Sequence, residues 1–470
     1  PLLIALELGA RPGAGVRFSS TTRSPVLAVD EPGYPIRTAM NFTSTEGERF
    51  AYNVAQGFDD IVVVIDDDQS ELVEALRTVT PRVHVVRLPS YRPRLPEPLC
   101  GPAFGSYAPD EVAWLLTDLS DLELEAPTEE REEAVQSGGV HYAESLPIEY
   151  QPTREYQALF AEALSESADR LAHAVGTVTE LVLDLRGPDT VLVSLARAGT
   201  PVGILMRRWA RWRHGVDLAH YAASIVRGRG IDRVALSYLA AAHGASRVMF
   251  VDGWTGKGAI ARELAAAVAG TAFSPELAVL ADTGSCVTLF GTRDDYLLPS
   301  ACLNSTVSGL VSRTVLNVRI LRPGQFHGAK FYKDLAPADV SGMFLDAVSG
   351  RFADVAADVA RDWPVLRASD RTPTWAGWAA VERIAAQYGI GSVNLVKPGV
   401  GETTRVLLRR VPWRVLVRPG AEGDLRHVLH LARERGVPVE EVPGLAYSCV
   451  GLIHPAYTRG ATGSDGRGVR

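Results

Sequence analysis

Cysteine is scarce in this sequence, and its four residues are scattered. Cys100, Cys286, Cys302 and Cys449 form no C-x-x-C pair, so the spacing of a zinc knuckle is missing. Sparse cysteines without such spacing are typical of a reducing compartment. We therefore expect a cytoplasmic protein.

Long apolar runs are also missing. No run reaches the roughly 18–20 residues that a membrane helix needs, and the opening P-L-L-I-A-L-E-L is too short and lacks the basic flank of a signal peptide. We expect no membrane association. The net charge of −7 argues against broad nonspecific binding of nucleic acid and leaves a local basic face for that role.

What is present is typical of a soluble globular protein of several domains. The chain has 470 residues, of which 46% are hydrophobic and 22% charged, and at about 100–200 residues per domain it should hold about three domains. Composition predicts a first domain over 1–97, a central domain over 101–358, a third over 370–456 and a disordered tail over 457–470. The start at Pro1 rather than Met suggests a processed chain or a preceding domain.

One stretch organises the central domain. Residues 248–251 are an apolar run that predicts a buried parallel strand, 253–258 predict a tight glycine-rich loop, and 259–269 predict a helix. The amides of such a loop and the helix N-terminus can hold a phosphate. Asp252 at the strand end can bind sugar hydroxyls, and Lys257 adds a positive charge. A plain strand–turn–helix, whose glycines serve only the turn, is the alternative.

Two more loops follow predicted strands. A-R-A-G-T-P-V-G at 196–203 comes after the strand at 191–195, and R-G-R-G at 227–230 comes after the strand at 218–226. Because the carboxyl ends of parallel strands lie on one rim of a doubly wound sheet, we expect the three loops to meet there. Such a rim suits a ligand with phosphates at two ends.

These loops resemble two motifs of the type I phosphoribosyltransferases. V-S-L-A-R-A-G-T-P-V-G resembles the pyrophosphate loop, and V-M-F-V-D-G-W-T-G-K-G resembles the loop for phosphoribosyl pyrophosphate. More closely, residues 104–355 resemble the StiP group found beside bacterial tellurite-resistance (Ter) stress genes. The resemblance includes G-S-Y-A-P-D-E-V at 105–112, H-Y-A-E at 141–144 and L-P-S-A-C-L-N-S-T-V-S-G-L at 298–310. That group is labelled a cysteine protease and has also been read as a phosphoribosyltransferase.

The transferase resemblance implies a doubly wound parallel sheet flanked by two smaller α/β modules. It implies transfer of 5-phosphoribosyl from phosphoribosyl pyrophosphate to a base-like acceptor, with Mg²⁺ bound at Asp252. It also implies a place in a Ter-linked pathway, with other Ter-operon biosynthetic enzymes as partners. The loop departs from the pattern, because Gly253 stands where a second acid is usual. The implied residues are Asp252, Lys257, Arg227 and Arg229 for catalysis, Arg197, Ala198, Gly199, Thr200, Thr255, Gly256 and Gly258 for phosphate, and Asp282 on the acceptor side.

Two alternatives remain open for the central domain. The first is a Cys–His hydrolase or cysteine protease that uses Cys302 and His327, with Asn304 or Asn317 orienting the imidazole. The second is a non-catalytic nucleotide sensor that binds RNA. Against the first, a cysteine is commonly just a small buried residue.

The flanking segments resemble two further families. Thr22-Arg23-Ser24-Pro25 resembles the signature of the TRSP domain, where Arg23, Arg37 and nearby hydroxyls either bind a phosphate or cap a turn. Residues 394–443 resemble the PELOTA-type RNA-binding domain. Its implied contacts with structured RNA are Gly401, Glu402, Thr403, Arg405 and Arg409. A protein-docking module is the alternative for this segment.

Overall fold

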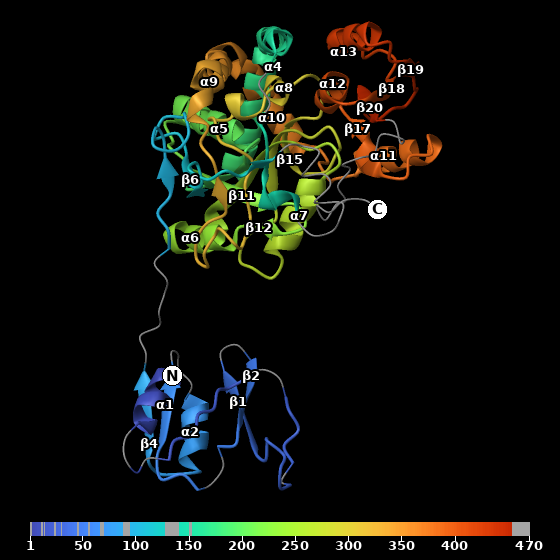
Figure 1. The fold of residues 1–470 in the computed structure, drawn as a ribbon. Coiled ribbons are helices and arrows are strands. Elements are labelled where there is room, and N and C mark those ends of the chain that lie inside the picture. The colour runs from blue at the N-terminus through green and yellow to red at the C-terminus, as the bar shows by residue number, and fades with distance from the viewer. Residues whose placement is uncertain are drawn as a thin grey trace. The chain divides into compact units, whose positions relative to one another are not determined.

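The chain folds into two compact units, Pro1–Arg94 and Leu95–Arg470 (Figure 1). The computed structural model describes residues 2–10, 13, 15–22, 25–29, 31–44, 47–54, 57–65, 70–87, 95–126, 141–149 and 153–453. Arg23 and the predicted tail at 457–470 lie outside these ranges. None of the helices within them is long and apolar enough to cross a membrane.

The first unit is small and has its own core. Its strands pair as an antiparallel hairpin, β1 with β2, and as a parallel pair, β3 with β4. Phe42, Leu72 and Leu76 are buried between them. The elements are α1 (Leu2–Gly9), β1 (Ala39–Ser44), β2 (Gly47–Tyr52), β3 (Ile61–Ile65), α2 (Ser70–Arg77) and β4 (Val83–Arg87).

The second unit is built on a sheet whose strands run mostly parallel. Its order is β15-β14-β13-β10-β11-β6-β5, with β12 beside β11, and only β5 and β12 pair antiparallel. The strands are β5 (Leu99–Cys100), β6 (Ala113–Leu115), β10 (Val191–Ala196), β11 (Ala219–Val226), β12 (Gly230–Ile231), β13 (Val248–Trp254), β14 (Leu277–Ala281) and β15 (Leu289–Thr292). The prediction of an α/β fold around a parallel-dominated sheet is confirmed.

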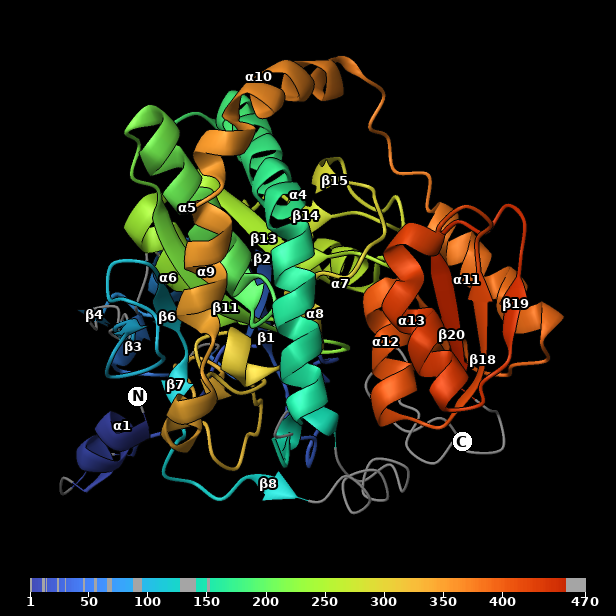
Figure 2. The ribbon, with the colours of Figure 1, turned by 90° about the horizontal axis from the view of Figure 1, so that it is seen from above.

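Helices cover both faces of this sheet, because successive strand residues point to opposite sides. Leu192, Met249 and Val251 pack into one hydrophobic core, while Val193 and Phe250 pack into the other. Figure 2 looks onto the first face, covered by α4 (Arg154–Arg186), α5 (Thr200–His214), α9 (Ser341–Ser349) and α10 (Phe352–Ala368). The second face carries α6 (Arg233–His243) and α7 (Ala259–Val268).

Short elements complete the central part of this unit. Two small parallel pairs tie the loops around the sheet, β7 with β16 and β8 with β9. The elements are β7 (Thr117–Asp118), β8 (Glu125–Ala126), η1 (Tyr142–Glu144), β9 (Leu146–Pro147), η2 (Ala245–Arg247), α8 (Pro299–Cys302), η3 (Ser305–Val307), β16 (Gly328–Ala329) and η4 (Lys333–Ala338).

Residues 375–453 form a four-stranded sheet with helices, which we call the C-terminal module. Its strand order is β17-β20-β18-β19. In Figure 2 the module lies beside α4 and α8 of the central part. Its elements are α11 (Ala376–Gln387), η5 (Val393–Leu395), β17 (Val396–Pro398), α12 (Val400–Arg409), β18 (Pro412–Val417), α13 (Glu422–Glu434), β19 (Val439–Glu441) and β20 (Cys449–Ile453).

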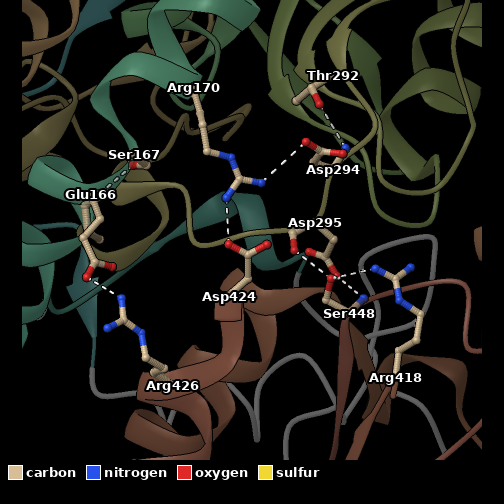
Figure 3. A network of polar contacts seen from close by, with 11 residues as sticks. Glu166, Ser167, Arg170, Thr292, Asp294, Asp295, Arg418, Asp424, Arg426 and Ser448 are labelled. Atoms are coloured by element: carbon tan, nitrogen blue, oxygen red, sulfur yellow. Dashed lines mark hydrogen bonds and ion pairs between the residues drawn. The ribbon is translucent and has the colours of Figure 1, made fainter. Parts of the chain in front are cut away.

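Polar contacts hold the module against the central part (Figure 3). The buried carboxylate of Asp295 accepts hydrogen bonds from the amides of Val400, at 2.9 Å, and Ser448, at 2.8 Å. Arg170 pairs with Asp424 across the junction at 2.7 Å. Because a buried acceptor stabilises only when its donors are in place, Asp295 ties the module to one position.

Candidate functional site

The glycine-rich loop lies where the sequence predicts it, between a buried strand and a helix. Strand β13 runs three residues further than expected, so Asp252 pairs in register with Val279 inside the sheet. Its carboxylate is 8% exposed and accepts a hydrogen bond from the amide of Gly253 at 2.8 Å. Burial raises the pKa of Asp252 to about 7. Near neutral pH this acid is therefore a mixture of its two protonation states.

Asp282 supports the loop from behind instead of facing an acceptor. Its side chain is fully buried and accepts hydrogen bonds from the hydroxyl of Thr255, at 2.5 Å, and the amide of Cys286, at 2.7 Å. Arg293 adds an ion pair at 3.4 Å. Asp282 therefore positions Thr255, and the sequence could not show which way its side chain points.

The C-terminal module covers part of the loop. The Tyr447 hydroxyl donates to the carbonyl of Gly256 at 2.8 Å, and Lys257 Nζ donates to the carbonyl of Val393 at 2.6 Å. Gly258 has φ +69°, and an added Cβ would lie 2.3 Å from the Trp375 ring. Glycine is needed there both for its backbone conformation and for the close approach of the module.

The predicted second phosphate loop is used differently. Arg197 Nη1 donates to the carbonyl of Val311 at 3.1 Å and lies 3.5 Å from Glu149. The hydroxyl of Thr200 is buried and has no hydrogen-bond partner among the described residues. An added Cβ at Gly199 would lie 2.4 Å from the carbonyl oxygen of Val251, so this glycine serves the packing of the loop on β13. From this loop, Ala198 reaches the cleft described below.

The two arginines of the dibasic loop at 227–230 lie in different surroundings. Arg227 lines the same cleft, while Arg229 is exposed and lies 4.0 Å from Glu144. Glu263 of α7 holds the loop by accepting hydrogen bonds from the amides of Gly228 and Gly230 at 2.9 and 3.0 Å.

These residues meet in a cleft of about 740 Å³ between the glycine-rich loop and the C-terminal module. The central part contributes Asp252, Lys257 and Arg227, and the module contributes Lys397 and Trp378. Lys397 and Trp378 were missed from the sequence, because nothing in their local pattern shows that the module folds back onto the loop. Within the described ranges no three His, Cys, Asp or Glu side chains come together as a metal site. The expected Mg²⁺ at Asp252 stays a prediction.

The predicted thiol and imidazole have separate surroundings. Cys302 ends α8 and is 1% exposed. His327 contacts the Ser224 hydroxyl through Nδ1 at 2.8 Å, and its amide donates to Asp232 at 2.6 Å. Burial lowers the pKa of His327. None of the contacts described for His327 involves Cys302.

The predicted RNA-binding residues lie in α12, which packs on α8. Arg405 Nε donates to the carbonyl of Ala301 at 2.9 Å and pairs with Glu402 at 3.1 Å. Thr403 is buried, and an added Cβ at Gly401 would lie 3.1 Å from the Cβ of Ala301. The side chain of Arg409 lies outside the described part of the structure. RNA contact through this turn stays a prediction.

The fold and its cleft define an α/β protein whose parallel sheet carries a glycine-rich loop under a C-terminal module. A family model described as "Tellurite-like stress resistance cysteine protease StiP" matches residues 105–349. The chain is also 35% identical over 353 residues to "Cysteine protease StiP" of Acinetobacter baylyi, which covers 72% of this chain and 90% of the relative. The chain belongs to the StiP family.

Two further models match the flanks. The model "TRSP domain C terminus to PRTase_2" matches residues 1–79, and "PELOTA RNA binding domain" matches residues 375–455. Both resemblances noted in the sequence are therefore present. No solved structure matches the chain.

The prediction that this chain is a phosphoribosyltransferase is wrong, because the family model and the relative both carry the name of a cysteine protease. The glycine spacing that suggested it has other structural causes here. Gly199 serves packing against β13, and Gly258 accommodates Trp375. Arg197, expected at a pyrophosphate, instead contacts Glu149 and Val311.

Proposed function

We propose that this chain is a cysteine-dependent hydrolase and that Cys302 supplies its nucleophile. Two observations carry the choice: the extent of the StiP match and the pKa of the Cys286 thiol. The StiP match spans 105–349, which contains Cys286 and Cys302 but neither Cys100 nor Cys449. Burial, followed by the charge of Asp282, raises the pKa of the Cys286 thiol to about 12. Because the thiolate is the reactive form, Cys286 is a poor nucleophile near neutral pH.

The segment around Cys302 is held by buried polar contacts. Ser305, three residues on, donates to Glu149 from its amide at 2.9 Å and from its hydroxyl at 2.8 Å. Glu149 in turn pairs with Arg197. We infer that Arg197 and Glu149 position the backbone that follows the thiol. A fixed backbone is what a nucleophile needs to meet a carbonyl carbon in a defined geometry.

The chemistry proposed is acyl transfer to sulfur. The Cys302 thiolate attacks the carbonyl carbon of the scissile bond, and the leaving amine takes up the proton that the thiol released. Water then cleaves the thioester, which releases the acid and restores the thiol. Because Cys302 is 1% exposed and its neighbour Ala301 is bonded to Arg405, substrate entry requires α12 to move.

The test compares Cys302→Ser with Cys286→Ser in the full chain. Both are incubated with a complex mixture of peptides, and new termini are counted by mass spectrometry. Removal of a nucleophile typically lowers turnover by a factor on the order of 10³ or more. We expect that loss for Cys302→Ser and near wild-type cleavage for Cys286→Ser, with circular dichroism confirming both folds. Undiminished cleavage by Cys302→Ser would remove the assignment.

A further inference from the structure

The cleft beside the glycine-rich loop is separate from the thiol chemistry and holds an unusual set of charges. Lys257 and Arg227 reach it from the central part, and Lys397 reaches it from the C-terminal module. Among the described residues, no hydrogen bond or ion pair is formed by the Lys397 ammonium. The carboxylate that acts on both lysines is Glu402, which is already paired with Arg405 at 3.1 Å.

These cations disfavour one another. Burial first, with the charges of Lys397 and Arg227 and against the opposite effect of Glu402, lowers the pKa of Lys257 to about 7. Burial also lowers the pKa of Lys397, with Arg410, Arg227 and Arg405 adding to the effect. Partly buried cations gathered in this way are stabilised when an anion enters among them.

The backbone beside the lysines adds donors. Helix α7 starts at Ala259 with no side-chain cap, and its N-cap residue Gly258 lies in the cleft wall. The first amides of a helix without a cap favour an anion. The indole of Trp254 lines the same space. The cleft thus combines helix amides and an aromatic wall with four cations, Lys257, Lys397, Arg227 and Arg262, and three carboxylates, Asp252, Glu263 and Glu402.

We propose that this cleft binds a small phosphorylated molecule whose phosphate lies among Lys257, Lys397 and Arg227 at the N-terminus of α7. Because the central part supplies two of these cations and the module supplies the third, the ligand also fastens the module to the central part. The proposal concerns binding only and is independent of Cys302.

The choice of a small molecule follows from the size of the cleft and from its partial cover by the module. The module closes over the loop through Tyr447–Gly256 and Lys257–Val393 hydrogen bonds at 2.8 and 2.6 Å. A volume of about 740 Å³ is in the range of small-molecule pockets. An RNA phosphate has similar chemistry, but the rest of the RNA chain would have to pass out of the cleft beside the loop and the module that line it.

The test titrates the full chain with inorganic phosphate, inorganic pyrophosphate and adenosine monophosphate by calorimetry. Lys397→Gln is the informative variant, because the side chain of Lys397 makes no described hydrogen bond whose loss would disturb the fold. Lys333→Gln, on an exposed lysine of η4 away from the cleft, is the matched control. We expect at least one probe to bind, at least tenfold weaker binding by Lys397→Gln, and no change for Lys333→Gln.

A second readout follows from the lysines. An anion should return Lys257 to its charged form, so binding at pH 7.5 should take up protons, seen as different heats in buffers of different ionisation enthalpy. Bound ligand should also raise the melting temperature of wild type more than that of Lys397→Gln. Failure of all three probes to bind, or equal binding by Lys397→Gln and wild type, overturns the proposal. Tighter binding of a short structured RNA that displaces the probes and depends on Lys397 also overturns it in favour of RNA.

Discussion

Replacing Asp295 with Asn should make the second unit gain stability relative to wild type as the pH rises to neutral, although it removes an acceptor from the junction in Figure 3. Asp295 is 8% exposed, and burial raises its pKa from 3.8 to about 6, against the lowering effect of the amides of Val400 and Ser448 and of Arg418. Tyr447 and Cys449 also lie close enough to feel its charge. The folded state therefore prefers the protonated acid more than the unfolded chain does.

The sign and size follow from this difference. A folded pKa above the unfolded value gives a contribution that is fully present below pH 3.8 and is lost as the pH rises to about 6. A difference of about two between the pKa values corresponds to roughly 3 kcal/mol. Asn is neutral like the protonated acid and does not titrate, but Val400 and Ser448 donate to separate carboxylate oxygens and the Nδ2 of Asn cannot accept from either amide. Asp295→Asn should thus be less stable than wild type near pH 4, by the roughly 1–3 kcal/mol that an unpaired buried amide costs. It should gain up to about 3 kcal/mol relative to wild type between pH 4 and pH 7.

Urea unfolding followed by tryptophan fluorescence measures this difference cleanly. All eight tryptophans, Trp114, Trp209, Trp212, Trp254, Trp363, Trp375, Trp378 and Trp413, lie in the second unit. Other acids titrate equally in both proteins, so the difference between the two curves isolates position 295. A variant that is less stable than wild type at pH 7, by a margin independent of pH, would show that the backbone donors outweigh burial and refute the reasoning.

Two further substitutions test the closeness of the module. Gly258→Ala should lower the free energy of unfolding by at least 1 kcal/mol more than Gly270→Ala. Both glycines have positive φ, but only a Cβ at 258 would meet Trp375, and crowding of this kind typically costs about 1–3 kcal/mol. Equal losses for the two variants in urea unfolding would contradict this prediction. Arg405→Ala should speed iodoacetamide labelling of Cys302 several-fold, measured by mass spectrometry, because it removes the hydrogen bond to the carbonyl of Ala301. Arg426→Ala, which removes an exposed ion pair with Glu166, is the control. Equal labelling rates in the two variants would argue that α12 does not cover Cys302.

Sequence patterns located the strands and the loops of the central part well. The predicted strand at 191–195 became β10, which ends one residue later, and the run 248–251 became the start of β13. Buried parallel strands are continuous apolar segments bounded by glycine, so their signal is local. The helix expected over 259–269 ends one residue earlier, at Val268.

What the sequence could not give is the direction in which polar side chains point. Arg197 and Asp282 lie near the predicted rim, but Glu149 and Thr255 draw them into internal networks. Those partners are 48 and 27 residues away in sequence. The spacing of residues within a motif carries no information about partners so distant in sequence. The prediction that Arg197 binds a phosphate depended on that spacing alone.

The C-terminal module connects the two proposed sites. Through α12 it is bonded to Ala301, the neighbour of the candidate nucleophile, and through Lys397 it closes the cationic cleft. Both contacts belong to neighbouring elements, because β17, which carries Lys397, leads directly into α12. An anion that fastens Lys397 in place should therefore also hold α12 over Cys302. Pyrophosphate or another bound probe should then slow iodoacetamide labelling of Cys302 in wild type but not in Lys397→Gln, and labelling that ignores the probe in wild type would show that the two sites work independently.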